Sequence, residues 1–173
     1  ELVKIGVSSP GPLDSRRGVI LETPNLKLMQ NVNLKKEIES KLNIETQIEN
    51  DANLFTLGEW CIAGKNQNEV FGAVTLGTGM GFGLIINGQI YRGAHGLATE
   101  YAISPLGDGN WENRVSIGAI KEIARQHLNG KELNPKRLSE LARDGDPNAQ
   151  RAWDEFGVNL GEDEDVGPRD LQR

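Results

Sequence analysis

The stretch that decides the fold runs from residue 46 to residue 63 and reads TQIENDANLFTLGEWCIA. Its opening residues 46–48 are typical of a short strand, and residues 52–63 are typical of a helix. The polar segment 49–53 therefore lies where a strand gives way to a helix. Ligands of open α/β sheets gather at the carboxyl ends of strands, so chemistry is expected at this junction.

The residues before this stretch repeat the same order of elements. An apolar run at residues 2–7 predicts a buried strand, which ends in the rigid turn Ser-Ser-Pro-Gly-Pro. Leu34, Ile38 and Leu42 follow helical spacing and predict a helix over residues 34–42. The order strand, helix, strand, helix predicts an α/β layer fold.

The residues after the stretch begin with a polar linker at 64–68. Apolar strands are predicted at 70–76 and 84–90, and the Asn-Gly pair inside the second run is the strongest short signal for a hairpin. The remaining residues predict helices. Two pairs are each typical of a helix N-cap followed by proline at the first helical position, Asn134-Pro135 and Asp146-Pro147.

The composition excludes several classes of protein. A formal net charge of -6 among 173 residues argues against a nucleic-acid partner, which favours a basic surface. The single cysteine, Cys61, excludes an intrachain disulfide and a thiolate metal cluster. Because no apolar run reaches membrane-spanning length and no signal peptide precedes the first strand, we expect a cytoplasmic protein without a membrane partner.

Asp51, inside the segment 49–53, is a candidate general base. A carboxylate at the end of a strand can accept the proton of an attacking hydroxyl, as phosphoryl-transfer enzymes require. The alternative is that Asp51 merely caps the following helix, since Asp and Asn are preferred caps. Viewed alone, Asp51 fits the cap better; two further clusters favour the base.

The first of these clusters is the turn Gly77-Thr78-Gly79 within LGTGMGFG at residues 76–83. Four glycines at alternating positions allow backbone amides to wrap an anion, and Thr78 adds a hydroxyl donor. The turn lacks the Gly-Lys-Ser/Thr of a Walker loop, and it opens a hairpin rather than the helix of a Rossmann fingerprint. The alternative is a glycine-rich turn without a ligand.

The second cluster is the loop at residues 91–100, which ends in Glu100, with Glu112 beyond a short glycine turn. Each sugar hydroxyl both donates and accepts hydrogen bonds, and carboxylates accept them in fixed directions. Two acids near one another therefore suit a sugar. Viewed singly, either glutamate is more simply a solvated loop residue.

Together these clusters resemble the ROK family of sugar kinases and repressors, within the actin/Hsp70/hexokinase-like ATPase superfamily. The resemblance covers residues 2–161 and implies a two-lobed α/β fold of the ribonuclease H-like, actin-like ATPase type, incomplete at both ends. It rests on five stretches in the family's order and spacing, residues 6–14 (GVSSPGPLD), 23–25 (TPN), 49–53 (ENDAN), 76–88 and 91–100.

The same resemblance divides the chain into three parts. Residues 1–64 correspond to part of the N-terminal lobe, ending in the helix that follows Asp51, and residues 65–161 to part of the C-terminal lobe with its phosphate-binding hairpin and helices. Residues 162–173 begin with four adjacent acids that repel one another, so we expect a disordered tail. The family's first phosphate hairpin and its adenosine motif are missing, so this chain alone is expected to be inactive.

Individual roles are also implied by the resemblance. Asp51 corresponds to the base that takes the proton of the sugar 6-hydroxyl, and Asn50 to the residue that binds a neighbouring hydroxyl. Glu100 and Glu112 correspond to the acids that hold the hydroxyls near the anomeric carbon. The other implied site residues are Asn25 and Gly11 in the sugar pocket, and Gly77, Thr78 and Gly79 around the phosphates of ATP with Mg²⁺ beside them.

The chain departs from the family at one metal site. Ile103 stands where the family commonly has a histidine that binds sugar and a structural zinc. The cysteine-rich zinc loop is replaced by the short segment 105–109, and His95 is in the wrong place to substitute for the missing ligand. We therefore expect no bound zinc.

The leading interpretation is ATP-dependent phosphorylation of a hexose, most simply glucose, at the 6-hydroxyl by the full-length protein. The alternative is the sugar-sensing effector domain of a ROK-type transcriptional repressor; a sensor needs no base, so the presence of Asp51 favours the kinase. A third interpretation is an inactive remnant with an exposed sheet edge. The family resemblance suggests a homo-oligomer, while the sequence itself leaves the oligomeric state open.

Overall fold

The computed structural model describes residues 2–23, 26–64 and 70–161. The chain divides into two compact units. The first unit comprises Glu1–Thr75 and Gly81–Tyr101, and the second comprises Leu76–Met80 and Ala102–Arg173. Residues 81–101 were predicted to belong to the C-terminal lobe, but they pack with the first unit. The expected disordered tail at 162–173 and most of the linker at 64–68 lie outside the described residues.

A pair of parallel strands organises the start of the first unit. Strand β1 (Ile5–Ser9) pairs with β4 (Thr46–Asn50), and Ser9 lies opposite Asn50. The connection between them contains β2 (Leu13–Asp14), β3 (Val19–Ile20), the 3-10 turn η1 (Lys27–Met29) and α1 (Leu34–Leu42). Both parallel strands end at the same edge, so the segments that follow them meet there.

Helix α1 covers the residues predicted for it and has a clear start and end. The side chain of its N-cap, Asn33, accepts a hydrogen bond from Lys36 N at 2.9 Å. The helix ends at Asn43, whose left-handed backbone (φ 52°) is a common helix terminus. Leu34 packs with a small core formed by Leu13, Ile20 and Ile48.

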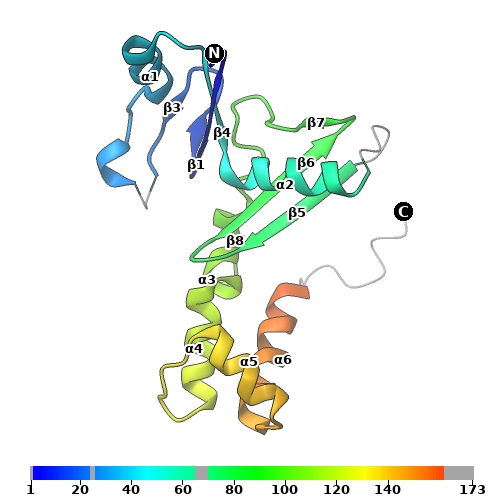
Figure 1. The fold of residues 1–173 in the computed structure, drawn as a ribbon. Coiled ribbons are helices and arrows are strands. Elements are labelled where there is room, and N and C mark those ends of the chain that lie inside the picture. The colour runs from blue at the N-terminus through cyan, green and yellow to red at the C-terminus, as the bar shows by residue number, and fades with distance from the viewer. Residues whose placement is uncertain (1, 24–25, 65–69, 162–173) are drawn as a thin grey trace. The chain divides into compact units, whose positions relative to one another are not determined.

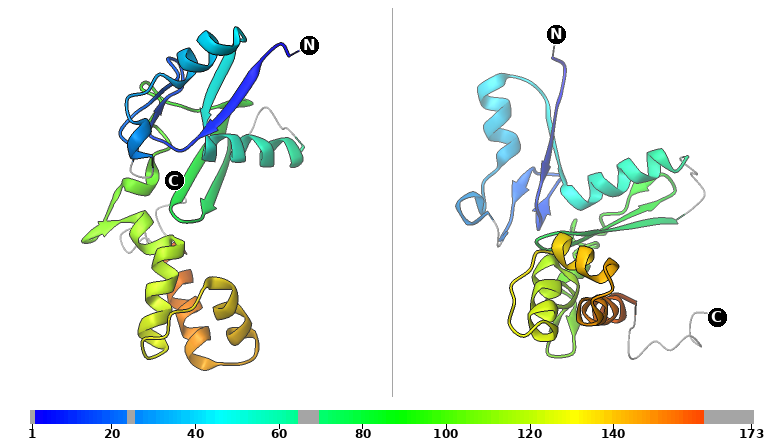
Figure 2. Two further views of the ribbon diagram at one scale, coloured as in Figure 1. Left: turned by 60° about the vertical axis from the view of Figure 1, so that its left-hand side comes forward. Right: turned by 60° about the horizontal axis from the view of Figure 1, so that its bottom comes forward.

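Helix α2 (Asp51–Ile62) lies along the hairpin formed by β5 (Val70–Leu76) and β6 (Met80–Ile86), which β7 (Gln89–Ile90) extends (Figure 1). Both views in Figure 2 show the same arrangement. The predicted Asn-Gly turn links β6 to β7, and Asn87 (φ 52°) and Gly88 (φ 73°) both have the positive φ that this turn requires.

Two glycines of β6 allow α2 to approach the hairpin closely. A Cβ atom at Gly81 would lie 2.8 Å from the Cβ atom of Ala52, and one at Gly83 would lie 2.8 Å from the carbonyl oxygen of Ala52. No side chain fits in either place without a shift of the helix. The structure thus gives Gly81 and Gly83 a packing role inside a strand, and the expectation that the glycines of this segment wrap an anion stays a prediction.

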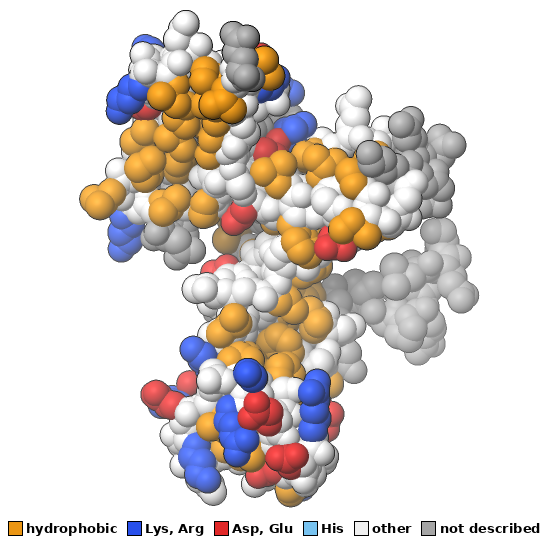
Figure 3. Space-filling model, viewed as in Figure 1, with side chains coloured by type: hydrophobic (Ala, Val, Ile, Leu, Met, Phe, Trp, Pro, Cys, Tyr) orange, Lys and Arg blue, Asp and Glu red, His pale blue; other side chains and the backbone are white. Residues whose placement is uncertain are grey.

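Helices make up most of the second unit. They are α3 (Trp111–Val115), α4 (Ile117–His127), α5 (Pro135–Arg143) and α6 (Pro147–Gly161), preceded by η2 (Tyr101–Ile103), β8 (Pro105–Leu106) and β9 (Gly109–Asn110). Their common core includes Val115, Ala124, Leu138 and Ala152. Figure 3 shows basic and acidic side chains interspersed over the surface of α4 and α5.

Both predicted Asx-Pro helix starts in this unit are confirmed. Asn134 accepts a hydrogen bond from Arg137 N at 2.8 Å, with Pro135 as the first residue of α5. Asp146 accepts from Asn148 N at 2.9 Å at the start of α6. Of the helices that the structure describes, none has the length and apolar character needed to span a bilayer.

Candidate active site

At the junction between β4 and α2, Asn50 and Asp51 have different roles at the start of the helix. Asn50 is the N-cap of α2, and its Oδ1 accepts a hydrogen bond from Asn53 N at 3.1 Å. Asp51 is the first residue of the helix and has an exposed side chain, whose Oδ1 accepts from Ala52 N at 2.9 Å. The cap is therefore Asn50, and Asp51 is exposed at the edge of the sheet where β1 and β4 end.

Gly11 and Glu100 join this junction from elsewhere in the chain. The turn after β1 lies beside the end of β4 because the two strands are parallel and in register. A Cβ atom at Gly11 would lie 2.6 Å from Asn50 Nδ2 and would overlap Glu100 Oε1. Backbone, amide and carboxylate thus meet at one point with no room for another side chain.

The carboxyl group of Glu100 is electrostatically linked to Asp51. Burial raises the pKa of Glu100, and the negative charge of Asp51 raises it further. Two carboxyl groups and one amide therefore lie in a single cluster, which we call the α2 cluster: Gly11, Asn50, Asp51 and Glu100. Acceptors and donors in this arrangement suit a ligand with several hydroxyl groups.

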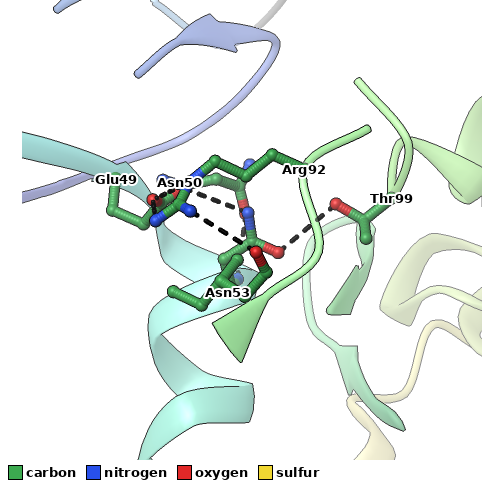
Figure 4. A network of polar contacts seen from close by, with 6 residues as sticks. Glu49, Asn50, Asn53, Arg92 and Thr99 are labelled. Carbon is green, nitrogen blue, oxygen red and sulfur yellow. Dashed lines mark hydrogen bonds and ion pairs between the residues drawn. The ribbon is translucent and has the colours of Figure 1, made fainter. Parts of the chain in front are cut away.

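An ion pair holds the start of the loop 91–100 to the same junction. Arg92 Nε donates to Glu49 Oε2 at 2.7 Å (Figure 4). The other oxygen of Glu49 accepts from Asn50 N and from Asn53 Nδ2, each at 3.0 Å. Glu49 thus connects the loop, the N-cap and the first turn of α2.

A second tether lies at the other end of the loop. The hydroxyl of Thr99 donates to Asn53 Oδ1 at 3.3 Å, and both side chains are buried (Figure 4). The sequence motifs contain Glu49, Asn53, Arg92 and Thr99, but no function was predicted for these four residues. Their signal is that all four are polar residues within the two segments 49–53 and 91–100.

The glycine turn belongs to the second unit together with Glu112. Gly77 N donates to Gly79 O at 2.8 Å, and Gly77 O accepts from Ile117 N at 2.8 Å. Thr78 at the tip of the turn is exposed. The turn is therefore fixed at its base, with the threonine hydroxyl facing solvent.

Glu112 is directed toward this turn. Its Oε2 accepts a hydrogen bond from Met80 N at 3.0 Å, and a Cβ atom at Gly79 would overlap that carboxylate. A glycine is consequently required at position 79.

Within the first unit, the structure brings together four of the residues proposed from the sequence, the α2 cluster. Within the second, it brings Glu112 together with the turn Gly77-Thr78-Gly79. Asn25 lies outside the described residues. Among those described, no three His, Cys, Asp or Glu side chains are grouped so that they could hold a metal ion.

Comparisons with known proteins agree on one family. The sequence model of the ROK family matches residues 1–163. The glucokinase of Streptomyces coelicolor is 31% identical over 156 residues, which cover 84% of this chain and 48% of that protein. The xylose repressor of Caldicellulosiruptor bescii is 29% identical over 184 residues, which cover 92% of this chain and 45% of that protein.

Solved structures show the same similarity. A ROK family glucokinase from Streptomyces griseus in complex with glucose and AMPPNP has a TM-score of 0.78 at 27% identity, covering 92% of this chain and 61% of that one. The chain spans about half the length of the curated relatives that it matches.

Proposed function

The chain belongs to the ROK family, and from this membership and the α2 cluster we propose that the complete protein uses ATP to phosphorylate a hexose, most simply glucose, at the 6-hydroxyl. The fold expected from the sequence, α/β of the actin-like ATPase type, is that of the family's sugar kinases. The observation that carries the proposal is the exposed carboxylate of Asp51, which is free of the capping task and lies beside a second, partly buried acid.

Asp51 acts as the general base in this proposal. Its carboxylate takes the proton of the 6-hydroxyl as that oxygen bonds to the terminal phosphorus, while the bond from this phosphorus to the bridging oxygen breaks and ADP leaves. Base catalysis of this kind contributes about 10²- to 10⁴-fold to a rate. Oδ1 of Asp51 accepts from Ala52 N at 2.9 Å, so Oδ2 is the oxygen to which this proposal assigns the proton.

The remaining cluster residues orient the sugar. Asn50 uses Oδ1 for the cap, so its Nδ2 is the group that donates to a hydroxyl beside the 6-position. Glu100 accepts from hydroxyls near the anomeric carbon, and Gly11 provides space for them. Glu112, in the second unit, keeps its proposed role as a sugar-binding acid; its Oε2 accepts from Met80 N, so the role falls to Oε1. Asn25 keeps its proposed place in the pocket.

The turn Gly77-Thr78-Gly79 is proposed to hold the phosphates of ATP. Its exposed threonine hydroxyl and its small residues fit an anion that approaches the backbone. Mg²⁺ is proposed to lie beside these phosphates. When bound, Mg²⁺ and ATP supply the phosphoryl group and neutralise its charge.

One specific observation keeps the repressor as the second candidate. The xylose repressor of Caldicellulosiruptor bescii matches 92% of this chain, so the same fold serves a regulator. A repressor effector domain would bind sugar without turnover, and its complete protein would bind DNA. The absence of a nucleic-acid partner is therefore part of the proposal for a kinase.

The two candidates differ in what the complete protein does with a sugar. We expect ATP- and Mg²⁺-dependent release of ADP with glucose, and weaker release with mannose, fructose or N-acetylglucosamine, together with formation of glucose 6-phosphate. ADP release by a coupled assay and sugar phosphate by mass spectrometry check this. Sugar binding without ADP release, combined with DNA binding that the sugar weakens, would instead establish the repressor.

A further inference from the structure

The loop at residues 91–100 places Glu100 in the α2 cluster but has little structure of its own. Its internal backbone hydrogen bonds are long, Ala98 N to Arg92 O at 3.3 Å and Glu100 N to Leu97 O at 3.2 Å. A loop with so few internal contacts cannot fix a side chain by itself. The position of Glu100 must be set by what the loop contacts.

The contact at the start of the loop is a partly desolvated ion pair. The side chain of Glu49 is 12% exposed, and its Oε2 accepts from Arg92 Nε at 2.7 Å. Exposed ion pairs contribute little because water screens them, whereas breaking a buried pair leaves an uncompensated charge. The side chain of Arg92 is 39% exposed, so water screens part of the attraction, but Nε and Nη2 of Arg92 both contact Glu49 Oε2. These contacts attach the start of the loop to Glu49.

The contact at the end of the loop involves the neighbour of Glu100. Thr99 is 7% exposed and donates to Asn53, which is 2% exposed and is itself held by Glu49. The two tethers thus converge on one glutamate at the end of β4. A Cβ atom at Gly11 would overlap Glu100 Oε1 and lie 2.6 Å from Asn50 Nδ2, so both groups border Gly11. A movement of the loop would therefore shift the carboxylate relative to Gly11 and Asn50.

We propose that Glu49, Asn53, Arg92 and Thr99 are positioning residues that set the affinity of the α2 cluster for sugar by holding Glu100 in place. None of the four needs to touch the sugar. The inference rests on the proposed function, because it takes the sugar as the ligand of Glu100. It adds a determinant of affinity that acts through another side chain.

Two substitutions in the complete protein test the tethers separately. Arg92→Met removes the ion pair and keeps the length of the side chain, and Thr99→Val removes only the hydroxyl. We expect each to raise the dissociation constant for glucose by about 10- to 100-fold, since displacements of about 1 Å have effects of this size. The KM for ATP should stay unchanged, and Arg92→Lys should restore part of the affinity.

Arg17→Met is the matched control. Arg17 belongs to the same unit and carries the same charge, but its side chain is 80% exposed and lies 4.0 Å from Asp14. It should leave the affinity for glucose unchanged. A loss in Arg17→Met as large as that in Arg92→Met would show that net charge, and not the tether, controls binding.

A double substitution shows whether the network acts through Glu100. In a Glu100→Ala background, Arg92→Met should weaken glucose binding little beyond the effect of Glu100→Ala alone, because the group that Arg92 positions is gone. Fully additive effects would overturn the inference.

Hydrogen exchange of the loop separates failure of this inference from failure of the proposed function. Arg92→Met should speed exchange at the amides of Ala98 and Glu100 by about tenfold or more, whether or not the protein is a kinase. Unchanged exchange contradicts the tether. If exchange is faster but the protein neither binds nor phosphorylates a hexose, the proposed function is contradicted and the structural role of the tether is supported.

Discussion

Asn50 and Asp51 are adjacent residues with the same preference for helix starts, and the structure assigns them different tasks. The side-chain oxygen of Asn50 accepts a hydrogen bond from Asn53 N, while Asp51 occupies the first helical position and is exposed. A negative charge in the first turn of a helix is stabilised by the aligned peptide dipoles. The start of α2 is therefore a favourable place for an acidic side chain.

Glu100 should make the stability of the protein depend on pH in a defined direction. Because its pKa is higher in the folded state, its contribution is fully present below about pH 4 and is lost as the pH rises through the raised pKa. Glu100→Gln cannot ionise and escapes this loss. The variant should therefore gain stability relative to the wild type as the pH rises, as measured by urea unfolding across pH values.

The control for this prediction removes the charge of Asp51, which is the second cause of the raised pKa of Glu100. In an Asp51→Asn background, the gain from Glu100→Gln should become smaller, because the charge of Asp51 no longer opposes ionisation of Glu100. The burial of Glu100 remains, so part of the gain should persist. A pH-independent difference between Glu100 and its glutamine variant contradicts the account.

At the residue scale, the sequence predicted several members of the candidate site but not the residues that hold them in position. The family resemblance implied site roles for Gly11, Asn50 and Glu100, and the structure brings these residues together. The pairs behind them are separated by 43 residues for Glu49 with Arg92 and by 46 for Asn53 with Thr99. Such pairings depend on how the loop folds back, which no local pattern encodes.

At the scale of elements, the close approach of α2 to β6 is the feature that glycine makes possible. Gly83 faces the backbone of α2. A Cβ atom at this position would lie 2.8 Å from the carbonyl oxygen of Ala52, which, unlike a flexible side chain, cannot move aside. Figure 3 also shows hydrophobic side chains at the surface over α2. Phe55 and Ile62 of this helix are exposed. The side of the helix that faces β6 is therefore fixed by backbone contacts.

Gly83→Ala should destabilise the first unit. The added Cβ atom would lie 2.8 Å from Ala52 O, and overpacking of this kind typically costs about 1–3 kcal/mol. Gly58→Ala is the control: Gly58 lies in α2, the helix that Gly83 contacts, and no atom lies within 4 Å of its new Cβ atom. That substitution should stabilise the helix by about 0.5–1 kcal/mol.

Urea unfolding of the two variants checks this prediction. Equal and small effects would show that α2 does not rest directly on the hairpin.

Elements were predicted better than their ends. The helix at 34–42 and both Asx-Pro helix starts are as expected, because caps and apolar spacing are local signals. The first strand is observed at Ile5–Ser9 rather than 2–7. Its pairing with β4 begins at Ile5 opposite Thr46, and Leu2 and Val3 are exposed. Strand ends depend on the partner strand, which the apolar run alone does not reveal.

At the scale of the whole molecule, the division of the chain follows packing rather than sequence order. Residues 81–101 lie after the predicted boundary but pack with the first unit, because Gly81 and Gly83 contact α2 and the loop 91–100 contacts Glu49. The extent of the two lobes in the complete protein stays a prediction.

Family membership fixes the fold more firmly than the activity. Relatives of this chain include a glucokinase and a xylose repressor, and the chain spans about half of each. A shared fold can serve both catalysis and sensing, so the distinction depends on the site. The inactivity expected of this chain alone also stays a prediction.

Replacement of Asp51 in the complete protein tests the central claim most directly. In Asp51→Asn the side chain keeps its shape and its acceptor for Ala52 N but cannot take a proton. We predict that kcat for ATP-dependent formation of glucose 6-phosphate falls about 10²- to 10⁴-fold, while the dissociation constant for glucose changes by less than about threefold. Turnover near that of the wild type, or a loss of glucose binding as large as the loss of turnover, would contradict the role of Asp51 as the base.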